Sequence, residues 1–299
     1  MSTKTAMITI AGRPNVGKST LTNYLVGEKI AIVSNKPQTT RNRICGIVTR
    51  DETQFVFVDT PGYHRSRTKL GDYMVNVARE SIADVDATIL VVEPVANVGG
   101  QEEDLIAKIK ASRSPAILAI NKIDTVEKDE LLAVIAAYSQ AADFDAIIPI
   151  SAKTGDGVEA LLKECAKYAQ ESHFLFPDDM TTDQHERQVM AEIIREKLLW
   201  TLDKEIPHGT AVEITKFSER DGASGEPVID VDATIYCEKA SHKGIIIGKG
   251  GSMLKKIGEL ARQDIESFMG TKVFLQTWVK VKENWRDSQA QLRNFGFRE

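Results

Sequence analysis

The first 176 residues alternate two hydrophobic patterns. Short runs of consecutive apolar residues, such as Ile89-Leu90-Val91-Val92, are typical of strands buried on both faces. Between these runs, apolar residues recur every three to four positions, which is the spacing of amphipathic helices. The predicted strands cover residues 6–11, 44–49, 54–59, 87–93, 116–121 and 146–150, and the predicted helices cover residues 18–26, 70–82, 102–111, 128–141 and 158–171. This alternation predicts an α/β fold with a mostly parallel sheet and helices on both faces.

The pattern changes beyond residue 176. Pro177 and a polar stretch interrupt it, and Asp183 is a suitable cap for the next helix. The expected order is then helix 184–202, strands 211–218 and 228–237, two helices around a glycine loop within 242–269, strand 272–281 and a short final helix. We therefore expect a first domain at 1–176, a linker at 177–183 and an α+β domain at 184–299.

Aromatic residues of the second domain are expected to serve its core. Trp200, Trp278 and Trp285 are predicted as core residues, and the alternative for Trp278 and Trp285 is to help close a ligand groove. Phe295 and Phe297, in the basic tail, are expected to dock on their own domain, with stacking on the ligand as the alternative.

Composition excludes several classes of protein. The 299 residues are 42% hydrophobic and 27% charged, which is ordinary for a globular chain. The longest apolar run, residues 87–92, is too short to cross a bilayer, and no signal-peptide pattern follows the N-terminus. Three widely spaced cysteines, Cys45, Cys165 and Cys237, predict buried thiols rather than disulfides or a zinc site. We expect a cytoplasmic protein.

The net charge of −5 averages two unequal parts of the chain. From Lys239 to Glu299 there are twelve lysines and arginines against six acidic residues, whereas the rest of the chain carries a net −11. A basic end on an acidic chain predicts a polyanionic partner for the last sixty residues. A solvated charged helix face is the alternative explanation.

A phosphate-binding signature follows the first predicted strand and opens the first predicted helix. The residues that fit the pattern GxxxxGK[ST] are Gly12, Arg13, Pro14, Asn15, Val16, Gly17, Lys18 and Ser19, with Thr20 directly after them. Glycines let backbone N–H groups surround a phosphate, and the helix N-terminus adds positive potential. Lys18 is expected to reach the β- and γ-phosphates, and the Ser19 hydroxyl to bind Mg²⁺.

Three further motifs each follow an apolar strand. In Asp59-Thr60-Pro61-Gly62 the carboxylate can hold Mg²⁺ and the Gly62 N–H can contact the γ-phosphate. In Asn121-Lys122-Ile123-Asp124 the last carboxylate can accept from N1–H and N2–H₂ of guanine, donors that adenine lacks. Backbone N–H groups of Ser151-Ala152-Lys153 can meet guanine O6. Their shared place at the carboxyl ends of strands predicts one site for GTP or GDP with Mg²⁺.

Together these motifs resemble the G1, G3, G4 and G5 elements of the translation-factor class of small GTPases. Gln38-Thr39-Thr40-Arg41, after Pro37, resembles their G2 element in switch I. The resemblance implies a P-loop NTPase fold with a Ras-like G domain. It also implies that Thr40, with Thr39 as the second choice, completes the Mg²⁺ shell when the γ-phosphate is present. The catalytic set would then be Lys18, Ser19, Thr40 and Gly62.

Two positions bear on the rate of hydrolysis. Tyr63, which we include in the nucleotide site, stands where Ras-like proteins have a water-orienting glutamine. We therefore expect slow intrinsic hydrolysis that a partner or an ion accelerates. Asn15 matches the P-loop asparagine with which related potassium-stimulated GTPases hold K⁺, so K⁺ is a possible cofactor. The alternative role of Asn15 is to stabilise the turn of the loop.

A second glycine motif lies in the basic segment. Ile247-Gly248-Lys249-Gly250-Gly251, followed by Lys255 and Lys256, resembles the GxxG loop of KH domains, which clamps about four nucleotides of single-stranded nucleic acid. The apolar residues 245–247 are expected to line a groove for bases. The alternative, a second phosphate-binding P-loop, lacks a following GK[ST]. The order α–β–β–α–α–β matches a type II KH domain and favours single-stranded RNA as the ligand.

A G domain followed by one KH domain resembles, over essentially the whole chain, the Era family of bacterial GTPases. The resemblance implies a GTP-controlled factor in assembly of the small (30S) ribosomal subunit, which binds 16S ribosomal RNA near its 3′ end. It also implies a cytoplasmic protein with some peripheral contact to the inner membrane, and we expect a monomer. GTP is expected to order residues 38–41 and 59–62 and so to alter access to the RNA groove.

Two other functions stay open. One is a GTPase of tRNA modification or of a membrane-linked process such as iron transport, with a structural KH-like module. Relatives of that kind carry a C-terminal modification cysteine or transmembrane helices, whereas the last cysteine here is Cys237. The other is an RNA chaperone in which the nucleotide only stabilises the fold.

Overall fold

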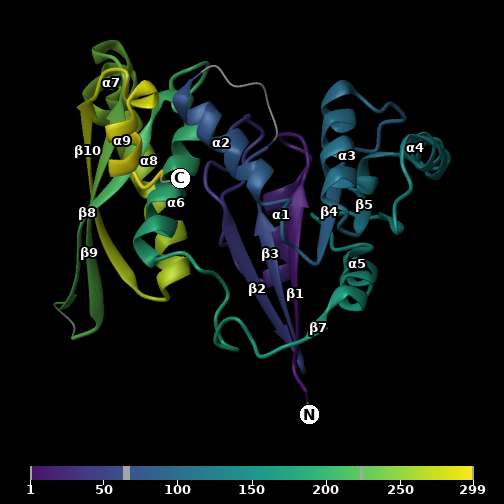
Figure 1. Cartoon of the computed structure of the whole chain (residues 1–299). Coiled ribbons are helices and arrows are strands. Elements are labelled where there is room, and N and C mark those ends of the chain that lie inside the picture. Colours follow the sequence, from purple (N-terminus) through teal and green to yellow (C-terminus); the bar gives the residue numbers. More distant parts are fainter. Residues whose placement is uncertain (1, 63–67, 223–224, 298–299) are drawn as a thin grey trace. The chain divides into compact units, whose positions relative to one another are not determined.

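The computed structural model describes residues 2–62, 68–222 and 225–297 (Figure 1). By their contacts, the residues form two compact units. The first unit comprises residues up to 67 together with 71–183, and the second comprises 68–70 together with the residues from 184 onward.

The first unit is built on a mixed sheet in the order β2-β3-β1-β4-β5-β6, with β7 beside β1. Its strands are β1 (Lys4–Ala11), β2 (Ile44–Arg50), β3 (Thr53–Asp59), β4 (Ala87–Val92), β5 (Ala116–Ile120), β6 (Ala146–Pro149) and β7 (Gln170–Glu171). The helices are α1 (Lys18–Val26), α2 (Lys69–Glu80), α3 (Gly100–Ser112), α4 (Lys128–Ala141) and α5 (Val158–Cys165), with short 3-10 turns η1 (Ile123–Thr125) and η2 (Ala166–Tyr168). The pairs β3–β1, β1–β4, β4–β5 and β5–β6 are parallel, whereas β2 and β7 run antiparallel to their neighbours. The predicted mostly parallel α/β sheet is confirmed.

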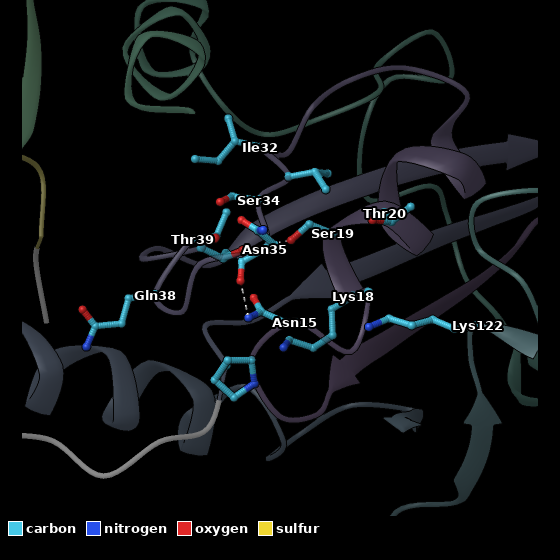
Figure 2. Close-up of a pocket in the computed structure, with 15 residues that line it drawn as sticks. Asn15, Lys18, Ser19, Thr20, Ile32, Ser34, Asn35, Gln38, Thr39 and Lys122 are labelled. Atoms are coloured by element: carbon cyan, nitrogen blue, oxygen red, sulfur yellow. Dashed lines mark hydrogen bonds between the residues drawn. The ribbon is translucent and has the colours of Figure 1, made fainter. Parts of the chain in front are cut away.

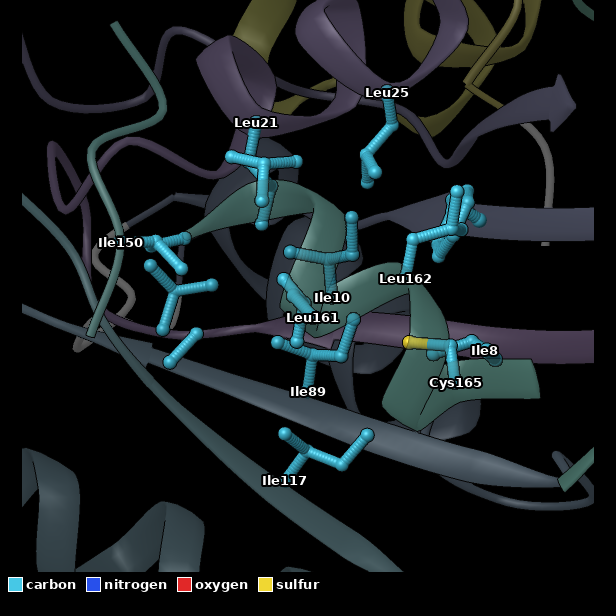
Figure 3. Close-up of a cluster of buried hydrophobic side chains, with 14 of the residues drawn as sticks. Ile8, Ile10, Leu21, Leu25, Ile89, Ile117, Ile150, Leu161, Leu162 and Cys165 are labelled. Atoms are coloured by element: carbon cyan, nitrogen blue, oxygen red, sulfur yellow. The ribbon is translucent and has the colours of Figure 1, made fainter. Parts of the chain in front are cut away.

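Alternation along the central strands divides the core between the two faces of this sheet. On one face the buried cluster joins Ile8, Ile10, Ile89 and Ile117 to Leu21 and Leu25 of α1 and to Leu161 and Leu162 of α5 (Figure 3). The strand residues between them, Leu90 and Leu118, pack on the other face with Ile106 of α3 and Tyr138 of α4. Helices therefore cover both faces, as the sequence predicts.

The helix predicted to run to residue 171 ends early, at Cys165. Strand β4 pairs with β1 from Ile8 onward, so the backbone of Lys4 and Thr5 needs another partner on that side. Glu171 and Gln170 supply it as strand β7. A long-range pairing therefore overrides the local helical pattern.

Residues 175–183, which include the linker predicted at 177–183, form a strap along the first unit. The fully buried Gln54 accepts from the backbone N–H groups of Leu175 and Phe176, at 2.9 and 3.0 Å, and donates to Phe176 O. The backbone N–H of Ile47 donates to Thr181 O at 2.9 Å. Leu175 and Phe176 therefore contact β3, whereas Thr181 and Thr182 lie along the outer edge of β2, which supplies unpaired backbone groups.

Asp183 does not cap the next helix as predicted. Its Oδ1 accepts from the Cys45 backbone N–H on β2 at 3.1 Å. His185 instead caps α6, in a capping box with Gln188.

The second unit follows the predicted α–β–β–α–α–β order of a type II KH domain. Its elements are α6 (Glu186–Thr201), η3 (Pro207–Gly209), β8 (Ala211–Asp221), β9 (Pro227–Cys237), α7 (Ala240–Ile247), η4 (Lys249–Gly251), α8 (Ser252–Met269), β10 (Lys272–Val281), η5 (Trp285–Asp287) and α9 (Gln289–Asn294). The sheet order is β10-β9-β8, in which β8 is antiparallel and β10 parallel to β9. Its core packs Ile193 and Ile194 of α6 and Ile257 and Ile265 of α8 against β9.

One of the three tryptophans is a core residue. Trp285 is fully buried, its Nε1 donates to Gly209 O at 2.9 Å, and Phe295 and Phe297 pack against its ring. The predicted docking of both phenylalanines is confirmed. Trp200 and Trp278 are 52% and 43% exposed, so the core prediction is wrong for them.

The three cysteines are free and buried, as predicted. Burial raises the pKa of Cys45 and of Cys165 to about 12, which keeps both thiols protonated near neutral pH. Within the described ranges, no helix is both long and apolar enough to cross a membrane.

Candidate functional site

The phosphate-binding loop connects β1 to α1. Gly17 caps the helix with a left-handed φ of 101°, and a Cβ there would lie 2.2 Å from Asn121 Nδ2. Glycine is thus required at this position by backbone conformation and by space. The Lys18 ammonium is buried and donates to Gly12 O and Arg13 O, at 3.1 and 2.8 Å. Burial lowers the pKa of Lys18 to about 8, an effect that the charge of Asp59 partly offsets.

Three oxygen-bearing side chains meet at the start of α1. Ser19 Oγ donates to Asp59 Oδ2 at 2.7 Å and lies 2.9 Å from Thr40 Oγ1. Asp59 is fully buried, and its Oδ1 has no hydrogen-bond partner among the described residues. Burial raises the pKa of Asp59 to about 6 although Lys18 opposes this. Two hydroxyls and a buried carboxylate with a spare oxygen fit the hard-oxygen preference of Mg²⁺.

Switch I places Thr40, and not Thr39, in this cluster. The Thr39 hydroxyl donates to Lys36 O at 2.7 Å within its own loop. The base of the loop is fixed by Asn23 of α1, whose Oδ1 accepts from the N–H groups of Ile30 and Ala31 and whose amide donates to Ala31 O. The sequence reading missed Asn23, although an asparagine inside a helix is a warning of a special role.

The segment Asp59-Thr60-Pro61-Gly62 lies beside the phosphate-binding loop, at the end of the site expected to hold the phosphates. Thr60 Oγ1 donates to Ile10 O at 3.0 Å, which ties this segment to β1. A Cβ on Gly62 would lie 2.8 Å from Pro14 N and Cα, so Gly62 lies directly against the phosphate-binding loop. Tyr63 lies outside the described residues.

The guanine motifs converge at the ends of β5 and β6. Asn121 Nδ2 donates to Val16 O at 2.8 Å, and Asn121 Oδ1 accepts from the Ala152 N–H at 2.9 Å. Ser151 Oγ donates to Asp124 Oδ1 at 2.7 Å, which orients an otherwise exposed carboxylate. Asn121 therefore holds the phosphate-binding loop and the 151–153 loop in one arrangement.

A pocket of about 290 Å³ lies between the phosphate-binding loop and switch I (Figure 2). Asn15, Lys18, Ser19 and Thr20 line it from one side, and residues 32–35 and 38–40 line it from the other. Lys122 also lines the pocket and forms an ion pair with Glu93. Asp124 and the 151–153 loop, including Lys153, are not part of this lining.

Asn15 joins the two sides of the pocket. It has a left-handed φ of 66°, and its Nδ2 donates to the Asn35 backbone carbonyl of switch I at 2.7 Å (Figure 2). The Asn15 amide thus presents an N–H group, not an oxygen, to the Asn35 carbonyl, which fits the alternative role of stabilising the loop.

The glycine loop of the second unit joins α7 to α8. Gly248, Gly250 and Gly251 have φ values of 74°, 60° and 83°. A Cβ on Gly248 would lie 2.7 Å from Met253 Cβ, whereas one on Gly250 would meet nothing within 4 Å. Of the apolar residues expected to line a groove, Ile245 is 50% exposed and Ile246 is fully buried, so Ile246 belongs to the core because the helix turns it inward.

The charge around this loop is accessible. Lys249, Lys255 and Lys256 are exposed, and Lys255 forms a long, solvated ion pair with Glu259 at 3.9 Å. Exposed cations of this kind can neutralise phosphates, since a solvated pair is weak.

A P-loop with an oxygen donor set and a guanine-directed loop, followed by a KH unit, defines a GTPase joined to a KH domain. The family model described as a 50S ribosome-binding GTPase matches residues 7–122, and that of the KH domain matches residues 205–286. The chain is 52% identical over 298 residues to GTPase Era of Ruminiclostridium cellulolyticum, covering 100% of this chain and 99% of that protein. GTPase Era of Clostridioides difficile is 50% identical, with 98% of both chains covered. The chain belongs to the Era GTPase family, which confirms the resemblance.

Two solved structures are similar over the whole chain. One is a variant of Aquifex aeolicus Era bound to GDP.AlF4-, with 36% identity, a TM-score of 0.93, and coverage of 99% of this chain and 100% of that chain. The other is Era in complex with MgGDPNP and nucleotides 1506–1542 of 16S ribosomal RNA, with 36% identity, a TM-score of 0.94 and the same coverage.

Proposed function

We propose that this chain is a GTP-hydrolysing switch whose KH domain binds 16S ribosomal RNA near its 3′ end during assembly of the 30S subunit. The observation that carries the proposal is the cluster of Ser19, Thr40 and Asp59 beside a buried Lys18, on the same chain as an open glycine loop with exposed lysines. Similar proteins solved with MgGDPNP and a 16S ribosomal RNA fragment, and with GDP.AlF4-, support it.

In this proposal the phosphate chain is held by the loop 12–19. Lys18 keeps its hydrogen bonds to Gly12 O and Arg13 O and donates its third N–H to a phosphate oxygen, and backbone N–H groups at the N-terminus of α1 face the same anion. Ser19, Thr40 and Asp59 would hold Mg²⁺. The ion would neutralise negative charge that develops on the phosphates during hydrolysis.

Base selection falls to the loops after β5 and β6. Asp124, oriented by Ser151, accepts from the two guanine donors, and backbone N–H groups of residues 151–153 face O6. Asn121 fixes the distance between this end and the phosphate end, because it bonds to both loops.

Hydrolysis depends on Thr40 and Gly62, which flank the position of the γ-phosphate. We propose a slow intrinsic rate, since Tyr63 is poorly suited to orient water. We also propose that K⁺ binds at Asn15, on the match of this residue to the P-loop asparagine of potassium-stimulated GTPases; the bond from its Nδ2 to the Asn35 carbonyl would then give way to the amide oxygen. Equal turnover in potassium and sodium salts, with Asn15→Ala harmless, would count against the ion site.

The RNA assignment is tested with a matched pair of variants at Gly250. Asparagine and aspartate both tolerate the left-handed φ of 60°, and a side chain there meets no neighbour. Gly250→Asp adds a negative charge to the loop, whereas Gly250→Asn changes shape alone. Both are crosslinked to total RNA with GTP, with GDP and without nucleotide.

We expect Gly250→Asp to reduce ribosomal-RNA crosslinks about tenfold or more, and Gly250→Asn to reduce them about threefold or less. Equal crosslinking by the wild type and Gly250→Asp would overturn the RNA site. Multiple-turnover hydrolysis stimulated by RNA would exclude a chaperone with a structural nucleotide. Crosslinks to tRNA alone would favour the modification function.

We further propose that the protein is a cytoplasmic monomer with peripheral contact to the inner membrane. Sedimentation and cell fractionation test these assignments separately from GTP and RNA binding.

A further inference from the structure

Arg13 belongs to the phosphate-binding loop, but its side chain does not line the nucleotide pocket. Its Nη1 donates instead to Glu102 Oε1 at 2.9 Å, across 89 positions of sequence. Glu102 lies in the first turn of α3.

Glu102 is an unusual partner because it is withdrawn from solvent. Its side chain is 7% exposed, against 42% for Arg13. Its Oε2 has no hydrogen-bond partner within the described part of the chain, and a Cβ on Gly99 would lie 2.9 Å from that oxygen. A carboxylate in such a place requires a counter-charge, which Arg13 and the N-terminus of α3 supply.

The charge of Glu102 reaches a second helix. Burial, followed by the charge of Glu102, raises the pKa of Tyr138 on α4 to about 12. Glu102 thus lies near α4, while the side chain of Arg13 reaches it from the half-exposed surface.

The backbone of Arg13 connects this pair to the phosphate site. Its carbonyl accepts from Lys18 Nζ at 2.8 Å, the shorter of the two bonds that hold the lysine. A Cβ on the preceding Gly12 would lie 2.5 Å from Val91 O, so the backbone passes close to β4 at this point. The Arg13 residue therefore joins α3, through its side chain, to Lys18, through its carbonyl.

We propose that Arg13 and Glu102 form an anchor that positions the phosphate-binding loop against α3, and that Arg13 is a positioning residue rather than a catalytic one. This proposal rests on the proposed GTPase site and adds Glu102 of α3 to the residues that support it. The anchor acts on ground-state binding of the phosphates, through the backbone that carries the N–H groups and Lys18.

The same chain offers a matched control. Arg50 donates to Glu159 at 2.8 Å, and the two side chains are 49% and 62% exposed. Residue types and distance are nearly those of the anchor, but the pair is solvated and contributes little.

The test measures dissociation constants for GDP and GTP, kcat and the unfolding midpoint for Arg13→Ala, Glu102→Gln, their double variant, Arg13→Lys and Arg50→Ala. We expect each of the first two to weaken both nucleotides about tenfold with kcat within about twofold, and the double variant to be no worse than either. Arg13→Lys should recover most of the affinity, and Arg50→Ala should match the wild type.

Several results would overturn the anchor. Unchanged affinity in Glu102→Gln, additive losses in the double variant, or a fall in kcat alone for Arg13→Ala would each do so. If Glu102→Gln does not fold, the half-exposed Arg13 still gives the comparison of alanine with lysine. A lower unfolding midpoint with unchanged nucleotide affinity would mean that the pair only stabilises the fold, and would also overturn the anchor. A wild type that binds no GTP would refute the proposed function instead.

Discussion

Two glycine loops of this chain begin helices in the same way and differ in what surrounds them. Gly17 caps α1 and Gly251 caps α8, with φ values of 101° and 83°, and neither end has a side-chain cap. A Cβ on Gly17 would collide with Asn121, whereas one on Gly251 would meet nothing within 4 Å. The first loop is enclosed by its own domain, and the second is open.

The charged side chains of the two loops differ in the same way, because those of the first are buried and those of the second are exposed. Lys18 and Asp59 are 6% and 0% exposed, while Lys249 and Lys256 lie in solvent. Enclosed charges act in a low dielectric, so they suit one small ligand and discriminate strongly. Exposed lysines are screened by salt and suit the backbone of a polymer. One backbone device thus serves two kinds of recognition.

The largest expected effect is a loss of base specificity at the nucleotide site, which depends on the exposed Asp124 rather than on the enclosed phosphate-binding loop. Asp124→Ala removes the acceptor for two guanine donors, so we expect the preference for GDP over ADP to fall by about 10³. Competition binding with both nucleotides measures it. Asp129→Ala, in the first turn of α4, is the control. A preference that stays within about tenfold of the wild type would contradict the assignment of Asp124.

The next expected effect is a pH dependence of nucleotide affinity, which applies to the enclosed phosphate-binding loop and not to the open glycine loop. Asp59 has a pKa of about 6 and must be ionised to bind Mg²⁺. Below that pH the carboxyl must first lose a proton, so affinity for GDP with Mg²⁺ should fall about tenfold per pH unit, and above it the affinity should be flat. Titration calorimetry from pH 5 to pH 7.5, at ~0.5-unit steps, measures this. A slope that persists in Asp59→Asn would point to another group, such as the nucleotide itself.

The smallest expected effect concerns RNA affinity, and its salt dependence, at the open glycine loop. Lys249→Gln and Lys256→Gln should each weaken RNA binding a few-fold and reduce the slope of log affinity against log salt by about 0.7. Filter binding at several salt concentrations measures both quantities. Lys163→Gln, on α5, is the control. If GDP binding shows as steep a salt dependence as RNA binding, the contrast between enclosed and open loops is wrong.

The sequence predicts the parts of the site that lie at strand ends. Short motifs after apolar runs place Lys18, Asp59 and Asp124 together, because parallel strands deliver their carboxyl ends to one edge. The order of elements in the KH domain follows from helical and strand periods in the same way.

Residues that act across long separations escape such reasoning. Nothing local to Glu102 marks its pairing with Arg13, and nothing local to Asp183 distinguishes a helix cap from a partner for Cys45. Trp200 shows that the sequence can also predict burial wrongly. An apolar side chain does not specify its own direction, and here Lys197 Nζ lies 3.8 Å from the centre of an indole that stays half-exposed.

The strap over β2 has a practical consequence for dividing the protein. A nucleotide-binding fragment cut at the end of the predicted domain, residue 176, would lose the carbonyl of Thr181 and the carboxylate of Asp183 that satisfy Ile47 and Cys45. The outermost strand of the sheet would then present bare N–H groups to other molecules, which is the usual starting point for edge-to-edge aggregation. A fragment extended to residue 183 carries its own edge cover and is the one to express.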